Sequence, residues 1–144
     1  MELKDSLNYV FDGDAILFLG AGFSIFNTNS EGEMLPLTKK LSEVLQLASG
    51  ISEKDIDNSL NIQQTSEYFI EKNGATALVD ILKKNFTVTK AFKWQRELAK
   101  FNWKSIYTTN YDNVFEIASD EADSHRYAVN ISKNLSLIHI SEPT

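Results

Sequence analysis

The sequence contains no cysteine, and only two histidines and two prolines occur among its 144 residues. Without cysteine, disulfides, thiol nucleophiles and thiolate metal sites are excluded from these residues, and we expect no metal site. No apolar run approaches the roughly 18 residues that a membrane-spanning helix needs. The opening Met1-Glu2-Leu3-Lys4-Asp5 lacks the basic stretch and apolar block of a secretory signal. These absences predict a cytoplasmic protein that contacts no membrane.

Basic residues are scarce relative to acidic ones. The 14 Lys and Arg against 20 Asp and Glu give a formal net charge of -6. Because nucleic-acid binding rests on a basic field that neutralises phosphates, we expect this segment to bind no nucleic acid. A small phosphorylated ligand is still compatible, since backbone N–H groups at a helix N-terminus can hold phosphates.

Hydrophobic patterning predicts an α/β chain. The run Ala15 to Leu19 is typical of a strand buried on both faces of a parallel sheet. Residues 105–108 predict a second buried strand, and alternation over 127–131 predicts a third. Between the first two strands, helical spacing predicts four helices, near 37–48, 56–72, 77–82 and 90–101. We therefore expect a Rossmann-like parallel sheet with a helical insertion between its first two core strands, the sheet being incomplete in this chain.

Two further segments flank the first strand. Leu3, Leu7 and Val10 share one helical face, which predicts an opening helix that packs on the sheet. Residues 27–32 are polar and turn-prone, which predicts an exposed loop.

The last ten residues, 135–144, match the translation of a transposase adapter used in sequencing libraries. We interpret them as non-native, and residues 1–134 as the N-terminal part of one domain whose natural sequence continues past Asn134. His139 then has no functional role. The alternative interpretation is a short terminal strand that ends at Pro143.

A glycine turn, Gly20-Ala21-Gly22-Phe23-Ser24, directly follows the first predicted strand. Glycine can adopt positive φ and lets a ligand approach the backbone closely, so this turn, with the Ser24 hydroxyl, can hold a pyrophosphate. A tight strand-to-helix connection without a ligand fits the glycines equally well. A dehydrogenase fingerprint would need a third glycine at Ile25, and a Walker loop would need a Gly-Lys-Ser or Gly-Lys-Thr, which the sequence lacks.

A second polar segment, Thr108-Thr109-Asn110-Tyr111-Asp112, follows the second predicted strand. Because the carboxyl ends of parallel strands meet at one crevice, it can share a ligand with the glycine turn. The alternative is that Asn110 and Asp112 only cap the next helix.

Together the two segments resemble the sirtuin-like (silent information regulator two-like) NAD-binding domain family, in the form carried by bacterial defence proteins. The glycine turn is similar to the family's glycine signature, and the second segment to its Thr-Gln-Asn-Ile-Asp motif; the likeness spans Ala15 to about Ile131. The resemblance implies NAD as ligand and substrate, bound by Gly20, Ala21, Gly22, Phe23, Ser24, Thr108, Thr109, Asn110, Tyr111 and Asp112. It also implies that Asn110 and Asp112 are catalytic, Asn110 at the nicotinamide ribose or its water and Asp112 at the carboxamide.

Two departures from the family pattern bear on the reaction. Residues 25–33 contain neither the Gly-Ile-Pro-Asp-Phe-Arg of deacylating sirtuins nor any arginine, which favours NAD hydrolysis with release of nicotinamide. The family's catalytic histidine is usually followed by glycine, whereas Arg126 follows His125, so we expect His125 on an exposed loop and this fragment to be inactive.

Three interpretations of the parent protein stay open at this stage. They are an NAD+ hydrolase acting in anti-phage defence, an NAD-dependent protein deacylase, and a non-catalytic nucleotide sensor. We further expect the parent protein to be a homo-oligomer that carries additional effector domains.

Overall fold

The computed structural model describes residues 2–131 of the chain. Residues 135–144, interpreted above as non-native, lie outside the described residues, so that interpretation stays a prediction. The described chain divides into two compact units: residues 2–35 together with 87–131, and residues 36–86.

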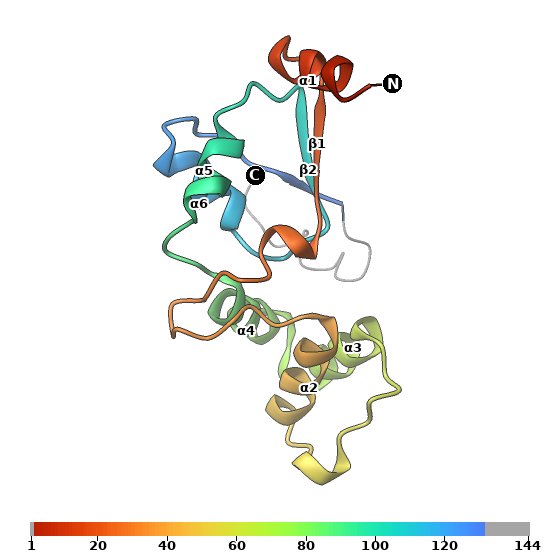
Figure 1. Ribbon diagram of the computed structural model, residues 1–144. Coiled ribbons are helices and arrows are strands. Elements are labelled where there is room, and N and C mark those ends of the chain that lie inside the picture. The colour runs from red at the N-terminus through yellow and green to blue at the C-terminus, as the bar shows by residue number, and fades with distance from the viewer. Residues whose placement is uncertain (1, 132–144) are drawn as a thin grey trace. The chain divides into compact units, whose positions relative to one another are not determined.

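The first unit contains a parallel sheet of three strands (Figure 1). They are β1 (Ile16–Leu19), β2 (Ser105–Thr108) and β3 (Val129–Asn130), in the order β1-β2-β3. Both pairings are parallel, with Leu19 opposite Thr108 and Thr108 opposite Asn130. The predicted α/β class and the three predicted strands are therefore confirmed, although β3 is shorter than the alternation suggested.

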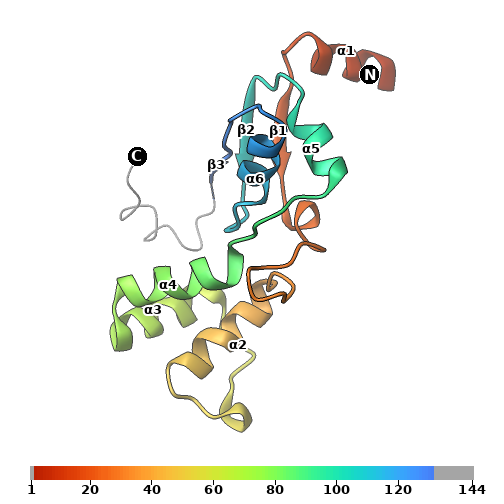
Figure 2. The same ribbon diagram turned by 90° about the vertical axis from the view of Figure 1, so that its left-hand side faces the viewer.

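One face of this sheet is covered by helices. The helices α5 (Lys93–Ala99) and α6 (Val114–Glu121) lie on the same side of β1 and β2 (Figures 1 and 2). The core between them is formed by apolar side chains at most 8% exposed, among them Leu19, Ala99, Trp103, Ile106, Val114, Phe115 and Ala118. Burial of this surface is the main favourable contribution to folding of the unit.

The opposite face of the sheet is exposed, which corrects the prediction of a first strand buried on both faces. Ile16 and Phe18 are 56% and 59% exposed, while Leu19 on the other face is buried. An apolar run is typical of a strand covered on both sides, but it does not ensure that another element packs on the second face of the sheet.

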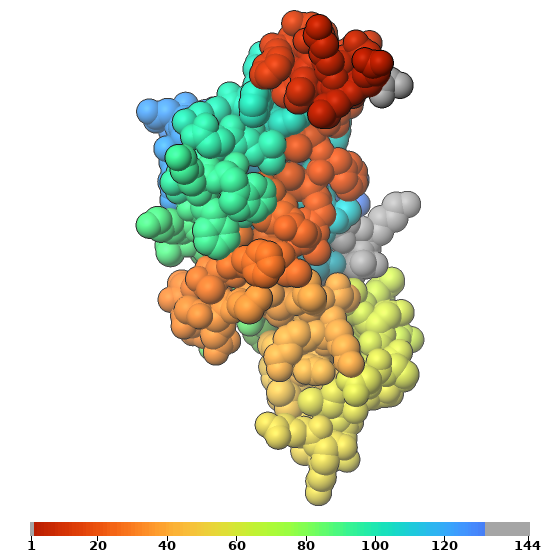
Figure 3. Space-filling model, viewed as in Figure 1, coloured from red at the N-terminus to blue at the C-terminus, as the bar shows by residue number. Residues whose placement is uncertain are grey.

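The opening helix α1 (Leu3–Phe11) forms as predicted but does not pack on the sheet. It has no buried residue, and Leu3 is 75% exposed. The space-filling view shows its side chains (red) open to solvent (Figure 3). Its last ring, Phe11, contacts Phe101 with centroids 5.9 Å apart. Helical spacing thus predicted the element correctly and its packing partner wrongly.

Residues 27–32 form a loop as predicted, with Thr28 and residues 30–32 exposed, but Asn27 and Asn29 are buried. The Asn29 Oδ1 accepts hydrogen bonds from the backbone N–H groups of Glu31 (3.0 Å) and Glu33 (3.1 Å). Thr28 and Met34 form an antiparallel bridge. Polar side chains that satisfy backbone donors can be buried, which composition alone does not reveal.

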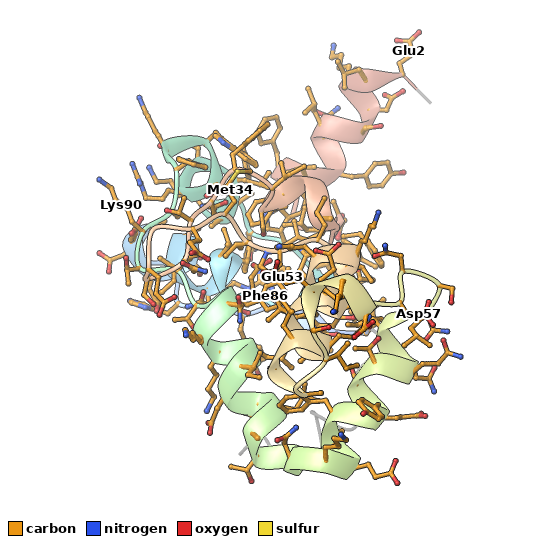
Figure 4. The ribbon with its side chains drawn as sticks, turned by 90° about the horizontal axis from the view of Figure 1, so that it is seen from below. Glu2, Met34, Glu53, Asp57, Phe86 and Lys90 are labelled. Atoms are coloured by element: carbon orange, nitrogen blue, oxygen red, sulfur yellow. The ribbon has the colours of Figure 1, made fainter. Side chains whose placement is uncertain are left out.

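The second unit is helical and follows β1 in the chain. It contains α2 (Thr38–Ala48), a short 3-10 turn at Glu53–Asp55, α3 (Ile62–Asn73) and α4 (Ala75–Phe86). Figure 4 shows Glu53 and Asp57 on the segment between α2 and α3, and Phe86 at the end of α4. The helix expected from residue 56 begins only at Ile62, because Asn61 forms a capping box with Gln64.

None of the helices between residues 2 and 131 is long and apolar enough to cross a membrane. Over the same residues, no cluster of three or more Asp, Glu or His side chains is arranged to hold a metal ion.

Candidate functional site

The two polar segments meet at one edge of the sheet. Each follows a strand, and the last residues of those strands, Leu19 and Thr108, are paired in parallel register. The backbone N–H of Thr109 donates to the Leu19 carbonyl (3.2 Å), which continues the pairing past the strand ends. The glycine turn and residues 108–112 therefore start from adjacent points.

Asn110 links the two segments directly. Its Nδ2 donates to the Gly20 carbonyl oxygen (2.8 Å), 90 positions away in the chain, and lies 3.5 Å from the Ser24 Oγ. Its backbone N–H donates to the Thr108 Oγ1 (2.9 Å), which holds the segment in a tight bend. The amide group of Asn110 is thus directed at the glycine turn and not at helix α6.

Asp112, by contrast, does cap the following helix. Its Oδ1 accepts a hydrogen bond from the backbone N–H of Val114 (3.0 Å) at the start of α6. It also forms a hydrogen bond with the Ser24 side chain. Ser24 therefore lies between Asn110 and Asp112, and its hydroxyl is buried within the site rather than open to a ligand.

Burial raises the pKa of the Asp112 carboxyl, and the hydrogen bonds from Val114 and Ser24 oppose this only in part. Glu116, one turn along α6, is similar: burial raises its pKa, and the nearby carboxylates of Asp112 and Asp120 raise it further. Two carboxyl groups that bind protons more tightly than usual therefore lie beside the candidate site.

The glycines of the turn are not explained by backbone conformation, which corrects the positive-φ argument. Gly20 has φ of -115°, and Gly22 is not among the residues with positive φ. A Cβ added at either position would meet no atom within 4 Å. Since neither conformation nor internal packing excludes a side chain, the space over Gly20 and Gly22 is open to an external group that approaches the backbone.

Phe23 belongs to the core rather than to the ligand surface. Its ring is buried and packs edge-on against Trp94, with centroids 5.4 Å apart, and lies 6.3 Å from Phe115. Its backbone groups are occupied as well, since the N–H donates to the Gly20 carbonyl (3.0 Å) and the carbonyl accepts from the Gln95 Nε2 (2.7 Å). The neighbouring Ala21, together with the two glycines, is exposed.

The remaining predicted residues fall into two groups. Thr108 is buried, and its hydroxyl is occupied by the Asn110 N–H. Thr109 is exposed and Tyr111 is half-buried.

Asn130 belongs to the site but was not predicted from the sequence. Its Nδ2 donates to the backbone carbonyl of Asn110 (2.5 Å), so it fixes the backbone of that segment. Asn130 ends β3, which places it at the same edge of the sheet as Gly20 and Thr108. The other two segments were predicted because polar residues follow a strand there. The same criterion applied to the third strand would have identified Asn130.

His125 lies at the other end of the sheet. It precedes β3, and it is exposed, as predicted, with Nδ1 3.2 Å from Asp120 and Nε2 3.3 Å from Asp123. It lines a surface hollow of about 350 Å³ that also includes Lys104 and Arg126. Because parallel strands all begin at that end, His125 is separated from the carboxyl-end site by the length of the strands.

Asp112→Asn tests the burial of the Asp112 carboxyl. Since its pKa is raised in the folded state, the folded protein binds this proton more tightly than the unfolded protein. The charged form therefore costs stability at pH 7, and that cost disappears as pH falls through the raised pKa. We expect wild type to gain stability relative to Asp112→Asn when urea unfolding is followed from pH 7 down to about pH 3.5, below the ordinary carboxyl pKa.

Asp57→Asn is the control with the opposite sign. A hydrogen bond with the Ser59 side chain lowers the pKa of the Asp57 carboxyl. Wild type should therefore lose stability relative to this variant as pH falls below about 5, through the ordinary carboxyl pKa and the lowered one. If the stability difference between wild type and variant changed with pH in the same direction for Asp112→Asn and Asp57→Asn, the raised pKa of Asp112 would be contradicted.

Comparison with known proteins gives one informative similarity. The chain is 28% identical over 117 residues to NAD(+) hydrolase ThsA of Cytobacillus dafuensis, an alignment that covers 79% of this chain and 22% of that protein. The chain thus spans about a fifth of that relative's length. No protein-family model and no solved structure matches the chain.

Proposed function

We propose that this chain is the N-terminal part of a sirtuin-like NAD-binding domain and that its parent protein is an NAD+ hydrolase. The observation that carries the proposal is the hydrogen bond from the Asn110 Nδ2 to the Gly20 carbonyl, because it joins the two segments on which the family resemblance rests. The similarity to a protein named NAD(+) hydrolase supports the same activity. In this proposal the sheet is Rossmann-like, and helices α2 to α4 are an insertion in it.

The turn from Gly20 to Gly22 would bind the pyrophosphate. The first N–H groups of a helical turn have no acceptor within it, and a Cβ added at Gly20 or Gly22 would meet no atom within 4 Å, so a ligand has room to approach this backbone. Each well-aligned N–H bond to a charged oxygen contributes about 1.5 to 3 kcal/mol. A net charge of -6 does not oppose this, because the contacts are made by local backbone groups.

Asn110 and Asp112 would act at the nicotinamide ribose. In hydrolysis, the bond between the ribose C1′ and the nicotinamide nitrogen breaks, and nicotinamide leaves with the bonding electron pair as a neutral molecule. Water then forms the new bond at C1′ and one proton is released. The transition state carries positive charge on the ribose, which a fixed amide dipole and a nearby carboxylate stabilise.

The same proposal includes the setting of the enzyme. We propose a cytoplasmic homo-oligomer in bacterial anti-phage defence, with effector domains outside this chain. The resemblance to bacterial defence proteins supports this setting.

Asn110→Ala in the full-length protein tests the catalytic assignment. We expect NAD consumption to fall by about 100-fold or more, since one preorganised polar group can contribute that much. Affinity for NAD should change less than turnover. The readout is nicotinamide release measured by chromatography.

The matched control is Asn73→Ala, because among residues 2–131 the Asn73 side chain donates only to the Phe69 carbonyl on its own helix. It should leave nicotinamide release unchanged. An active wild type whose turnover survives Asn110→Ala would contradict the assignment. A wild type that binds NAD and never releases nicotinamide would instead identify a sensor.

Gly22→Ala tests the phosphate cradle. The added methyl group meets no protein atom and no positive φ is needed, so the free energy of unfolding should change by no more than about 1 kcal/mol. The methyl group would, however, occupy the space that the pyrophosphate needs. We expect the Kd for NAD, measured by calorimetry, to rise by about tenfold or more. Unchanged affinity in a stable variant would place the ligand elsewhere.

A further inference from the structure

A buried pair of side-chain amides contacts the end of the glycine turn. Gln95 of α5 is 0% exposed and Asn27 is 2% exposed. The Gln95 Nε2 donates to the Asn27 Oδ1 (2.7 Å), and the Asn27 Nδ2 donates back to the Gln95 Oε1 (3.1 Å). The same Nε2 also donates to the carbonyl oxygen of Phe23 (2.7 Å), the last residue of the 3-10 turn.

All hydrogen-bonding positions of the Gln95 amide are occupied. Its Oε1 accepts a second bond from the backbone N–H of Phe92 (2.8 Å), at the start of α5. A primary amide offers two donor hydrogens and two acceptor lone pairs, and here each has a partner. Because a buried amide that rotated would leave polar groups unpaired, its orientation is fixed.

The pair holds the chain on both sides of Ser24. Gln95 fixes the carbonyl of Phe23, which precedes Ser24, and the backbone N–H of Asn27 donates to the Ser24 carbonyl (3.0 Å). Trp94, the neighbour of Gln95, packs against the Phe23 ring. In the space-filling view the turn and the loop after it (orange) lie against α5 (green) (Figure 3). Helix α5 therefore contacts the backbone directly before Ser24, whose hydroxyl lies between Asn110 and Asp112.

We propose that Gln95, together with Asn27, is a positioning residue for the candidate NAD site. It holds the Phe23 carbonyl, and through it the Ser24 hydroxyl that lies between Asn110 and Asp112. The catalytic consequence rests on the proposed function, whereas the effect on the turn does not.

Gln95→Glu in the full-length protein tests this role. The substitution removes both donors, to Phe23 and to Asn27, and keeps the acceptor for Phe92. We expect kcat for nicotinamide release to fall by roughly tenfold or more with a smaller change in KM, because two buried hydrogen bonds are lost. Hydrogen–deuterium exchange of residues 20–27 should speed up by a similar factor.

The pH dependence of the Gln95→Glu variant separates positioning from a general loss of stability. When protonated, the introduced carboxyl has one O–H that can donate to the Phe23 carbonyl again. Burial beside carbonyl oxygens raises the pKa of such a carboxyl, which favours its protonated form. The ratio of variant to wild-type kcat should therefore rise as pH falls, and the exchange of residues 20–27 in the variant should approach that of wild type measured at the same pH.

Gln46→Glu is the matched control. Gln46 is a 1% exposed glutamine of α2 whose Nε2 donates to the Asp57 carbonyl (3.0 Å) and whose Oε1 accepts from the Asp57 N–H (2.8 Å). The substitution makes the same chemical change in the helical unit. It should lower stability and leave kcat and the exchange of residues 20–27 unchanged. Equal effects of the two variants on kcat and exchange would overturn the proposal.

Asn27→Ala is the second variant, for the case that Gln95→Glu does not fold. It removes the reciprocal amide bonds but keeps the bond from Gln95 to Phe23, so a fall in kcat of about threefold is expected. Wild-type kcat with wild-type exchange of residues 20–27 would contradict the proposal. If the wild type hydrolyses no NAD, the proposed function fails, and the exchange measurement still decides whether Gln95 holds the turn.

Discussion

The parallel pairing of β1 with β2 is the constraint on which the candidate site depends. With Leu19 opposite Thr108, the chain leaves both strands at the same edge of the sheet. Only in this register can the Asn110 side chain reach the Gly20 carbonyl, 90 positions away. A shift of the pairing by one residue would move the segment after β2 by about 3.3 Å relative to Gly20.

The site is held by polar contacts on a hydrophobic base. The Phe23 ring anchors the turn among Trp94 and Phe115, while its carbonyl is held by Gln95. On the other side, Asn130 fixes the backbone of Asn110. The exposed backbone of Gly20 to Gly22 is therefore carried by residues that are themselves tightly held. Such preorganisation favours binding and catalysis, because the conformational entropy of these residues is already lost on folding and not when the ligand binds.

Much of this arrangement could be predicted from the sequence. The strands and most helices follow from local patterns of apolar residues, and the two polar segments follow from their position after strands. What failed depends on contacts between distant residues. Examples are the exposed face of the sheet at Phe18, the helix α1 that does not pack on the sheet, and the buried side chain of Asn27. The pairing of Asn27 with Gln95 spans 68 positions, and no local pattern marks it.

The separate roles of Asn110 and Asp112 show the same limit. Both residue types cap helices, and spacing alone does not distinguish capping from contact with the turn. The structure separates them, because Asp112 accepts the Val114 N–H while Asn110 donates to Gly20. The Asp112 carboxyl nonetheless stays at the site through its hydrogen bond with Ser24.

The most direct test of the central claim is a crystal structure of the full-length protein with a non-hydrolysable NAD analogue. We predict that the pyrophosphate lies over Gly20 to Gly22 and that the nicotinamide ribose lies beside Asn110. An analogue bound at the opposite end of the sheet, in the hollow lined by Lys104, His125 and Arg126, would contradict the claim that the two polar segments form one site.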